Sequence, residues 1–321
     1  MAYENELAVA QKAVMAAAKL CETVRQDMVP EAMEKKDKSP VTVADYGSQA
    51  IICKALSESF PNDPVVGEED ATELKLPEMG DRLQQVAQFV QGVIGTVTPE
   101  DVTRWIDHGN GQTAKRFWTL DPIDGTKGFL RGDQYAIALA LIEDGDLKVG
   151  ILGCPALDLG AGTTGLLFTA VRGEGTYMQP IEGGTAKQVN VVQPGDAERL
   201  RFVESVEASH GNQAEQEAVA KAVCITQESV RMDSQAKYGA VAAGEAALYL
   251  RLPSPKYPDY REKIWDHAAG AIVVEEAGGQ VTDMYGKPLD FYTAAKMNDN
   301  RGVVVSNGTI HEDVMSALKI S

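Results

Sequence analysis

An apolar run that meets two closely spaced acids constrains this chain more than any other part of it. Residues Phe117–Leu120 have the composition of a buried strand, and Asp121-Pro122-Ile123-Asp124-Gly125-Thr126 follows at once. The rigid proline and the permissive glycine predict a tight turn that directs both carboxylates to one place. Carboxylates held together repel one another unless a cation lies between them. We therefore expect the strand to stop at Asp121, beside a cavity that holds a cation.

The same turn offers further oxygen and nitrogen atoms for a ligand. The Ile123 carbonyl is expected to face the cavity and to give Mg²⁺ a third oxygen. Gly125 and Thr126 are expected to begin a short helix whose free N–H groups can receive phosphate. A bare Asp-x-x-Asp is more often a solvated turn, so the pattern alone is moderate evidence. An EF-hand is excluded because position 12 is Gly132, and no phosphate-binding Gly-x-x-x-x-Gly-Lys-Ser/Thr loop occurs.

The charge balance limits the class of partner. The chain has 321 residues, with 30 Lys and Arg against 47 Asp and Glu, and a formal net charge of −17. This length predicts roughly two packed units. The acidic excess disfavours nucleic acid polymers and anionic membrane surfaces, which bind through Lys and Arg. Acids that first hold divalent cations can still bind a small phosphate compound.

Cysteine usage and hydropathy indicate a soluble protein of the cytoplasm. The sequence lacks a CxxC pair, so it predicts neither a disulfide framework nor a zinc site. We find no secretory signal pattern near the start, and the longest apolar runs, such as Tyr135–Ile142, are too short to span a bilayer. The four cysteines are Cys21, Cys53, Cys154 and Cys224.

Periodicity predicts a layered α/β (α+β) chain in two halves. The first half, residues 1–160, has long helices over 7–24 and 42–59, with Thr42 as N-cap of the second. It also has a strand hairpin over 135–143 and 147–154, which makes it rich in antiparallel sheet. The second half, residues 161–321, is a smaller alternating α/β unit. Its expected strands lie at 166–171, 201–204, 225–230 and 248–252, and its helices at 212–223, 234–244 and 265–277.

Three motifs in order give the sequence a family resemblance. Gly67-Glu68-Glu69-Asp70, the Asp121–Thr126 turn and Trp265-Asp266-His267-Ala268-Ala269-Gly270 follow one another over nearly the whole chain. Together they resemble the signature of the lithium-sensitive inositol monophosphatase superfamily. The resemblance implies an αβαβα sandwich and a Mg²⁺-dependent phosphomonoesterase.

Two further segments narrow the resemblance to one branch. Asp233-Ser234-Gln235-Ala236-Lys237-Tyr238, followed by Leu248–Pro253, resembles the nucleotide-recognition segment of the 3′(2′),5′-bisphosphate nucleotidases. Less closely, Glu204–His210 resembles the segment that leads to a substrate-contacting histidine. The branch implies hydrolysis of 3′-phosphoadenosine 5′-phosphate to AMP and phosphate, with the sulfated analogue as a second substrate. The resemblance also implies inhibition by Li⁺.

The resemblance also assigns roles to individual residues. It implies that two or three Mg²⁺ ions bind at the site, and that Asp45 and the Thr126 hydroxyl take the proton of the attacking water. Hard oxygen ligands agree with Mg²⁺. The implied metal ligands are Glu68, Asp121, the Ile123 carbonyl, Asp124 and Asp266. The implied substrate-binding residues are Gly125, Thr126, His210, Ser234, Lys237 and Arg251.

Several of these residues have ordinary structural explanations as well. An acid in the first turn of a helix, such as Asp45, is favoured by the helix dipole alone. Without the resemblance, Ser234 would be interpreted as an N-cap, Lys237 as a helix-surface lysine and His210 as a loop histidine.

Two other functions remain open at this point. One is an inositol (poly)phosphate 1-phosphatase or sugar bisphosphatase of the same superfamily, because all members share the acids. The other is a nucleotide or metal sensor without turnover. The sequence leaves both a monomer and a homodimer open.

Overall fold

The structure is a computed structural model that describes residues 2–27, 33–34, 40–160, 162–207 and 212–319. The N-terminal elements are α1 (Glu4–Asp27), β1 (Met33–Glu34), β2 (Pro40–Val41), α2 (Val43–Ser59), β3 (Val65–Gly67), α3 (Gly80–Ile94) and α4 (Pro99–His108). The central elements are β4 (Arg116–Asp124), α5 (Thr126–Arg131), β5 (Ala136–Glu143), β6 (Asp146–Cys154), β7 (Leu166–Val171), β8 (Gly175–Pro180) and β9 (Lys187–Val189). The C-terminal elements are β10 (Phe202–Ser205), α6 (Gln213–Ala222), β11 (Val230–Met232), α7 (Ala236–Ala242), β12 (Leu248–Arg251), α8 (Ala268–Glu276), β13 (Gln280–Thr282), β14 (Val303–Ser306) and α9 (His311–Leu318). The structure contains most of the helices and strands that the sequence predicts, and β8, β9, β13, β14 and α9 in addition.

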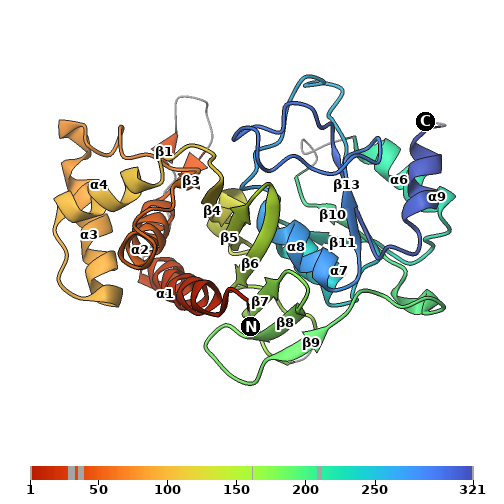
Figure 1. Cartoon of the computed structure of the whole chain (residues 1–321), viewed down its shortest axis with the longest axis horizontal. Coiled ribbons are helices and arrows are strands. Elements are labelled where there is room, and N and C mark those ends of the chain that lie inside the picture. Colours follow the sequence, from red (N-terminus) through yellow and green to blue (C-terminus); the bar gives the residue numbers. More distant parts are fainter. Residues whose placement is uncertain (1, 28–32, 35–39, 161, 208–211, 320–321) are drawn as a thin grey trace.

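The elements stack in five layers (Figure 1). Helices α1 and α2 cover one face of a seven-stranded sheet, and α3 and α4 pack outside them. Helix α8 covers the opposite face, and α7 joins it between this sheet and a five-stranded sheet. Helices α6 and α9 pack together against the far side of the five-stranded sheet. This arrangement confirms the expected αβαβα sandwich.

The seven-stranded sheet is almost entirely antiparallel, as the sequence predicts for the first half. Its order is β3-β4-β5-β6-β7-β8-β9, and only β3 and β4 run parallel among these pairs. The turn between β5 and β6 uses Asp144 and Gly145, both with positive φ, which suits a two-residue hairpin. Strand β6 precedes residue 160 and strand β7 follows it, and the two strands pair with each other. The seven-stranded sheet therefore contains residues from both sides of the division expected at residue 160. The change from one sheet to the other comes between β9 and β10.

The five-stranded sheet is mixed and forms the alternating part of the chain. Its order is β11-β10-β12-β14-β13. Strand β10 runs parallel to β11 and β12, whereas β14 is antiparallel to β12 and β13. The apolar residues of α7 and α8 fill the space between the two sheets. This central layer brings the ends of both sheets to one place.

Three local predictions differ from the structure. Strand β4 does not stop at Asp121 but continues to Asp124, with a shift of register against β5 between these two residues. Pro122 has no N–H to donate, so the ladder is interrupted while the chain stays extended. The strand expected at 225–230 is wrong, because β11 begins only at Val230 and Cys224 has a φ of 62°. Helix α7 starts at Ala236, because Ser234 has a φ of 64°.

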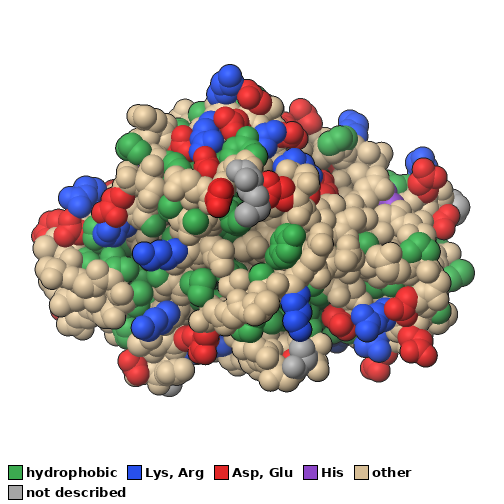
Figure 2. All heavy atoms as spheres, turned by 60° about the horizontal axis from the view of Figure 1, so that its bottom comes forward, with side chains coloured by type: hydrophobic (Ala, Val, Ile, Leu, Met, Phe, Trp, Pro, Cys, Tyr) green, Lys and Arg blue, Asp and Glu red, His purple; other side chains and the backbone are tan. Residues whose placement is uncertain are grey.

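The surface mixes both signs of charge. Figure 2 shows acidic and basic side chains interspersed over one face, with apolar side chains between them. Within the described ranges, the helices lack the combination of length and apolar character needed to cross a bilayer.

Candidate active site

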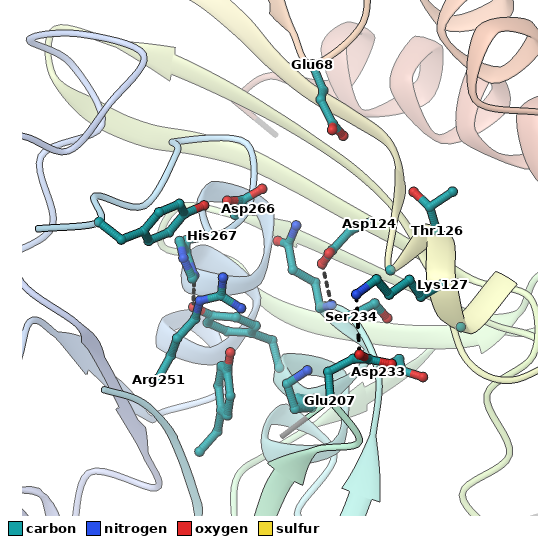
Figure 3. A pocket seen from close by; sticks show the side chains of 17 residues that line it. Glu68, Asp124, Thr126, Lys127, Glu207, Asp233, Ser234, Arg251, Asp266 and His267 are labelled. Atoms are coloured by element: carbon teal, nitrogen blue, oxygen red, sulfur yellow. Dashed lines mark hydrogen bonds and ion pairs between the residues drawn. The ribbon is translucent and has the colours of Figure 1, made fainter. Parts of the chain in front are cut away.

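One cavity brings together most of the residues that the sequence singles out. It has a volume of about 370 Å³ and lies between residues 124–128, at the end of β4 and the start of α5, and residues 233–238, at the start of α7. Figure 3 shows Glu68, Asp124 and Asp266 in the upper and middle part of the cavity and Arg251 below them, while Glu207 and Asp233 lie at its lower end near Lys127. The expected residues that line it are Glu68, Asp124, Gly125, Thr126, Ser234, Lys237, Arg251 and Asp266.

The acids come from three places that the fold makes adjacent. Glu68 follows β3, which runs parallel to β4, and its N–H donates to the Leu120 carbonyl at 3.1 Å. Asp121 is therefore beside it, and it is buried just behind the cavity lining. Asp266 lies just before α8, whose start faces the same cavity. Parallel pairing of β3 with β4 thus explains why two sequence motifs separated by more than fifty residues meet.

These carboxylates destabilise one another. Burial raises the pKa of Asp121 well above its usual range, and the charges of Glu68, Asp124 and Asp266 raise it further. Burial likewise raises the pKa of Asp266, and Glu262 and Asp124 add to the effect. A cation removes this repulsion, since it compensates several carboxylates at once.

The donor set fits a hard divalent cation. The cavity lining includes the carboxylates of Glu68, Asp124 and Asp266. Ile123 is not among the lining residues; its carbonyl accepts a hydrogen bond from Thr126 Oγ1 at 3.2 Å and keeps a second lone pair. Oxygen donors of this kind select Mg²⁺ or Ca²⁺ over softer metals. A neighbouring group, Glu262, Asp266 and His267, also brings ligand atoms within 4.8 Å of one another. There, however, Glu262 is paired with Arg251 and His267.

Asp45 reaches the cavity through Thr126. It is fully buried in the first turn of α2, where its Oδ2 accepts hydrogen bonds from the Thr42 N–H at 2.7 Å and from Thr42 Oγ1 at 2.6 Å. Thr42 is the N-cap, so the two residues form a capping box. The other oxygen, Oδ1, accepts from Thr126 Oγ1 at 3.3 Å. The helix start thus places a carboxylate behind a hydroxyl that lines the cavity.

The segment before α7 is hydrogen-bonded to Asp124 at the end of β4. The Gln235 N–H donates to Asp124 Oδ2 at 2.6 Å, and Ser234 Oγ accepts from the Ala236 N–H at 3.2 Å. Gly125 has a φ of 85°, and a Cβ there would lie 2.9 Å from Ser234 Cβ. Only glycine therefore suits this close approach of the two segments.

Lys237 is not the surface lysine that the bare sequence suggests. It is 4% exposed, and burial lowers its pKa to about 8, although Asp124 opposes this shift. Its Nζ lies 3.3 Å from the Met232 carbonyl and 5.1 Å from the centre of the Tyr249 ring. The Arg251 side chain is 22% exposed and pairs with Glu262, with 2.8 Å between Nε and Oε2. Two basic groups therefore line the same cavity as the acids.

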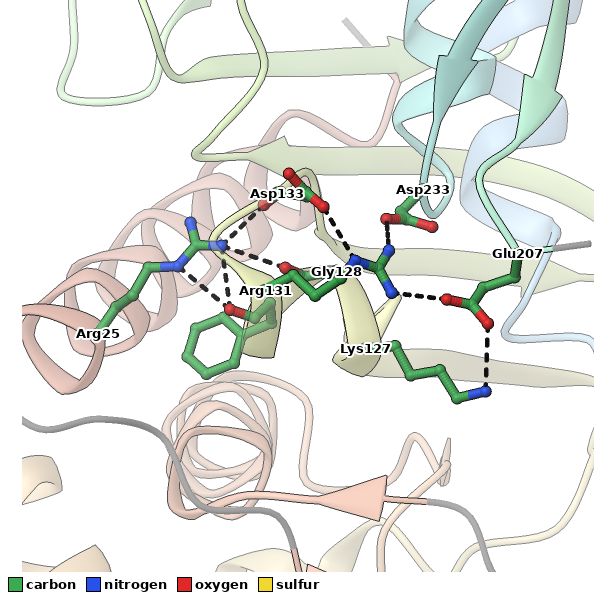
Figure 4. Close-up of polar contacts among 8 residues, drawn as sticks. Arg25, Lys127, Gly128, Arg131, Asp133, Glu207 and Asp233 are labelled. Atoms are coloured by element: carbon green, nitrogen blue, oxygen red, sulfur yellow. Dashed lines mark hydrogen bonds and ion pairs between the residues drawn. The ribbon is translucent and has the colours of Figure 1, made fainter.

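An ion-pair cluster fixes α5 at the rim of this cavity (Figure 4). Arg131 pairs with Asp133, Glu207 and Asp233, and Lys127 also contacts Glu207. On its other side, Arg25 of α1 donates to the backbone carbonyls of Gly128, Phe129 and Asp133. The helix that begins with Thr126 is thus held by both halves of the chain.

Sequence reasoning missed several residues of this region, and one expected residue cannot be placed. His210 lies outside the described residues. Gln235 was not singled out, yet its side chain also bonds the Trp265 carbonyl and the Gly270 N–H at the start of α8. Glu262 and His267 were missed as well, because neither stands in a spacing that predicts a contact with Arg251.

Comparison with known proteins identifies the family. A family model described as "Inositol monophosphatase family" matches residues 3–321. The 3′(2′),5′-bisphosphate nucleotidase of Emericella nidulans is 42% identical over 350 residues and covers 99% of each chain. The enzyme of that name from Schizosaccharomyces pombe is 42% identical over 341 residues, which are 99% of this chain and 96% of the other. The 3′(2′),5′-bisphosphate nucleotidase 1 of Arabidopsis thaliana is 42% identical over 346 residues, with 100% and 97% coverage.

Solved structures match the same fold at lower identity. Inositol monophosphatase from Anabaena superimposes with a TM-score of 0.65 at 21% identity, covering 100% of this chain and 97% of the other. CysQ from Bacteroides thetaiotaomicron, a bacterial member of the inositol monophosphatase family, gives 0.63 at 20% identity, with 96% and 98% coverage. The motifs, the five-layer fold and these matches agree over nearly the whole length, and the chain belongs to the inositol monophosphatase family.

Proposed function

We propose that this protein is a Mg²⁺-dependent 3′(2′),5′-bisphosphate nucleotidase that hydrolyses 3′-phosphoadenosine 5′-phosphate to AMP and phosphate. The observation that carries the proposal is one cavity lined by the acids Glu68, Asp124 and Asp266 together with the basic residues Lys237 and Arg251. One phosphate group would meet the acids through the metal, and a second would pair with the two basic residues. Curated relatives that are 42% identical over nearly the full chain bear this name.

The acids would hold the metal, in two or three positions. We assign Glu68, Asp121, the Ile123 carbonyl, Asp124 and Asp266 as its ligands. Bound Mg²⁺ supplies charge for the scissile phosphate and lowers the pKa of the attacking water. Li⁺ is proposed to inhibit by competing for one of these positions.

Asp45 and Thr126 would move the proton of the attacking water. The single hydrogen of the Thr126 hydroxyl can be donated to Asp45 Oδ1 or to the Ile123 carbonyl, at 3.3 and 3.2 Å. When Asp45 accepts it, the Thr126 oxygen can accept a hydrogen bond from water in the cavity. As the water attacks phosphorus, its proton passes to Thr126 Oγ1 while the Thr126 proton passes to Asp45. Asp45 ends protonated, and its proton is available for the departing 3′ oxygen.

The remaining residues would orient the nucleotide. The N–H groups of Gly125 and Thr126 are proposed to face the scissile phosphate at the start of α5. Lys237 and Arg251 would bind the 5′-phosphate, the former as a point charge and the latter through a planar fork. Ser234 would bind phosphate or sugar, and His210 is assigned the same role on resemblance alone. Within the cell we place the enzyme in the cytoplasm, which agrees with the free, buried thiols of Cys21, Cys53 and Cys154.

Phosphate release from three substrates tests this function. With Mg²⁺ present, we expect turnover of 3′-phosphoadenosine 5′-phosphate to exceed that of inositol 1-phosphate and inositol 1,4-bisphosphate. Faster turnover of either inositol ester would instead make the protein an inositol phosphatase. Tight nucleotide binding without any phosphate release would make it a sensor.

A further inference from the structure

We propose that Glu262 is a positioning residue that gives the enzyme its preference for a second phosphate group, because it holds Arg251 in place at the cavity. This inference rests on the proposed function. Glu262 does not line the cavity itself. It therefore acts through Arg251, and its role is distinct from that of the metal-binding acids.

Glu262 joins two side chains of the cavity wall. One of its oxygens, Oε2, lies 2.8 Å from Arg251 Nε and 3.2 Å from His267 Nε2. The Glu262 side chain is only 11% exposed, so solvent screens these contacts weakly. Burial favours the neutral acid, but Arg251 and His267 outweigh it and lower the pKa of Glu262 to about 2. The carboxylate is thus ionised at neutral pH.

His267 in turn is fixed from the opposite side. Its Nδ1 lies 2.7 Å from the Tyr238 hydroxyl, and the Tyr238 ring packs edge-on against Tyr249 with centroids 5.4 Å apart. Since Glu262 only accepts, Nε2 carries the hydrogen and Nδ1 accepts from Tyr238. Lys237 precedes Tyr238 on α7, and its Nζ lies 5.1 Å from the centre of the Tyr249 ring. A network of contacts through Glu262, His267, Tyr238 and Tyr249 therefore connects Arg251 with Lys237.

The anchored arginine is the group that a second phosphate would meet. A bond at Nε fixes the plane of the guanidinium, and Figure 3 shows this group beside His267 at the cavity. An unanchored arginine would have to lose its rotamer freedom on binding, which weakens the complex. A substrate with only one phosphate, held at the metal-binding acids, does not use this contact. Glu262 should therefore affect bisphosphates and leave monophosphates nearly unchanged.

The variant Glu262→Asp tests this, because it keeps the charge and shortens the reach to Arg251 and His267. The measurement is kcat/KM for 3′-phosphoadenosine 5′-phosphate divided by kcat/KM for adenosine 3′-monophosphate. We expect this ratio to fall about tenfold through a higher KM for the bisphosphate, the size of effect that a small misplacement produces. Adenosine 3′-monophosphate should be turned over as by the wild type.

A matched variant controls for the effect of shortening a largely buried glutamate that forms an ion pair. Glu276 is 10% exposed and pairs with Arg172 at 3.3 Å, away from the cavity lining. Glu276→Asp should leave the ratio at the wild-type value. Tyr238→Phe removes a single hydroxyl of the network and should lower the ratio in the same direction, by less. It supplies the test if Glu262→Asp does not fold.

A double-mutant cycle decides whether Glu262 acts through Arg251. In an Arg251→Met background, Glu262→Asp should not change the ratio further. A further fall there, an equal loss for both substrates, or an unchanged ratio in the single variant would each overturn the proposal. If the wild type hydrolyses neither nucleotide, the proposed function fails. In that case, the affinities of the two nucleotides, measured by calorimetry across the same variants, test the role of Glu262 independently of turnover.

Discussion

Replacing Asp45 by Asn separates a catalytic role from a structural one. The carboxylate has two sets of contacts, the capping box with Thr42 and the hydrogen bond from the Thr126 hydroxyl. Asn keeps the shape and can still accept from the Thr42 N–H. It cannot take up the proton that Thr126 would pass on during water attack. Turnover should therefore be lost while the fold and nucleotide binding remain.

The expected sizes of the two effects differ widely. Loss of a positioned general base lowers kcat about 10²- to 10⁴-fold, or about 3 to 5 kcal/mol in the barrier. The capping charge is worth about 1 kcal/mol of stability. Its loss is offset because Asp45 also adds to the repulsion that raises the pKa of Asp121. We therefore expect the free energy of unfolding to change by less than about 1 kcal/mol.

The assay combines phosphate release under saturating Mg²⁺ with calorimetric binding of AMP. The matched control is Asp101→Asn in α4, where Thr98 and Asp101 form a second capping box away from the cavity. That variant removes the same charge from a capping box and should keep its kcat. If Asp45→Asn retained kcat within about threefold of the wild type, Asp45 would not be the proton acceptor. Equal loss of kcat in both variants would point to a purely structural effect.

Three further perturbations follow from the site. Gly125→Ala should destabilise the protein by about 1 to 3 kcal/mol in urea unfolding, because φ is 85° and the new Cβ would meet Ser234. The control is Gly132→Ala, where φ is also 85° but, apart from its chain neighbours, no described residue has an atom within 4 Å of the new Cβ, and it should destabilise the protein less. Equal losses in both variants would contradict the close approach of Gly125 to Ser234. The pKa of Lys237 near 8 predicts that kcat/KM for the bisphosphate falls as pH rises through about 8, when the amine becomes neutral. Lys237→Arg should abolish this fall. In the wild type, the free energy of unfolding should rise between pH 8 and 10.5, because in that range the unfolded chain binds a proton that the folded chain has lost. Chelation should stop turnover, and added Mg²⁺ should raise the melting temperature in differential scanning calorimetry, less so as the pH falls, because the raised pKa values of Asp121 and Asp266 favour the protonated acids. No rise at neutral pH would contradict the assigned metal ligands.

The parts of the site that sequence predicted are those fixed by short-range patterns. Thr42 as N-cap and Asp45 as an acid in the first turn were predicted from four consecutive residues, and the structure contains both; that the two form a capping box is seen only in the structure. The turn after β4 was predicted for a similar reason, since proline and glycine restrict the backbone locally. Its strand was nevertheless drawn too short, because a proline at an irregular sheet position interrupts hydrogen bonding without ending the strand.

What sequence could not predict depends on contacts between distant segments. Lys237 has the neighbours of an ordinary helix residue, and its burial comes from α7 lying between two sheets. Arg251 belongs to one of the sequence motifs and Glu262 to none, and their pairing exists only once β12 and the segment before α8 meet. No residue spacing encodes either fact. The metal-binding motifs were recognised as a set through their resemblance to a family rather than through geometry.

The hydrogen bond from Gln235 to Asp124 has a wider consequence. It links Asp124, a proposed metal ligand at the end of β4, to the segment before α7 that carries Ser234 and Lys237, the proposed substrate-binding residues. A cation bound to Asp124 would therefore also act on the position of that segment. If it does, bound cation should raise the affinity for the nucleotide, and by linkage the nucleotide should raise the affinity for the cation by the same factor. Ion and nucleotide would then bind cooperatively.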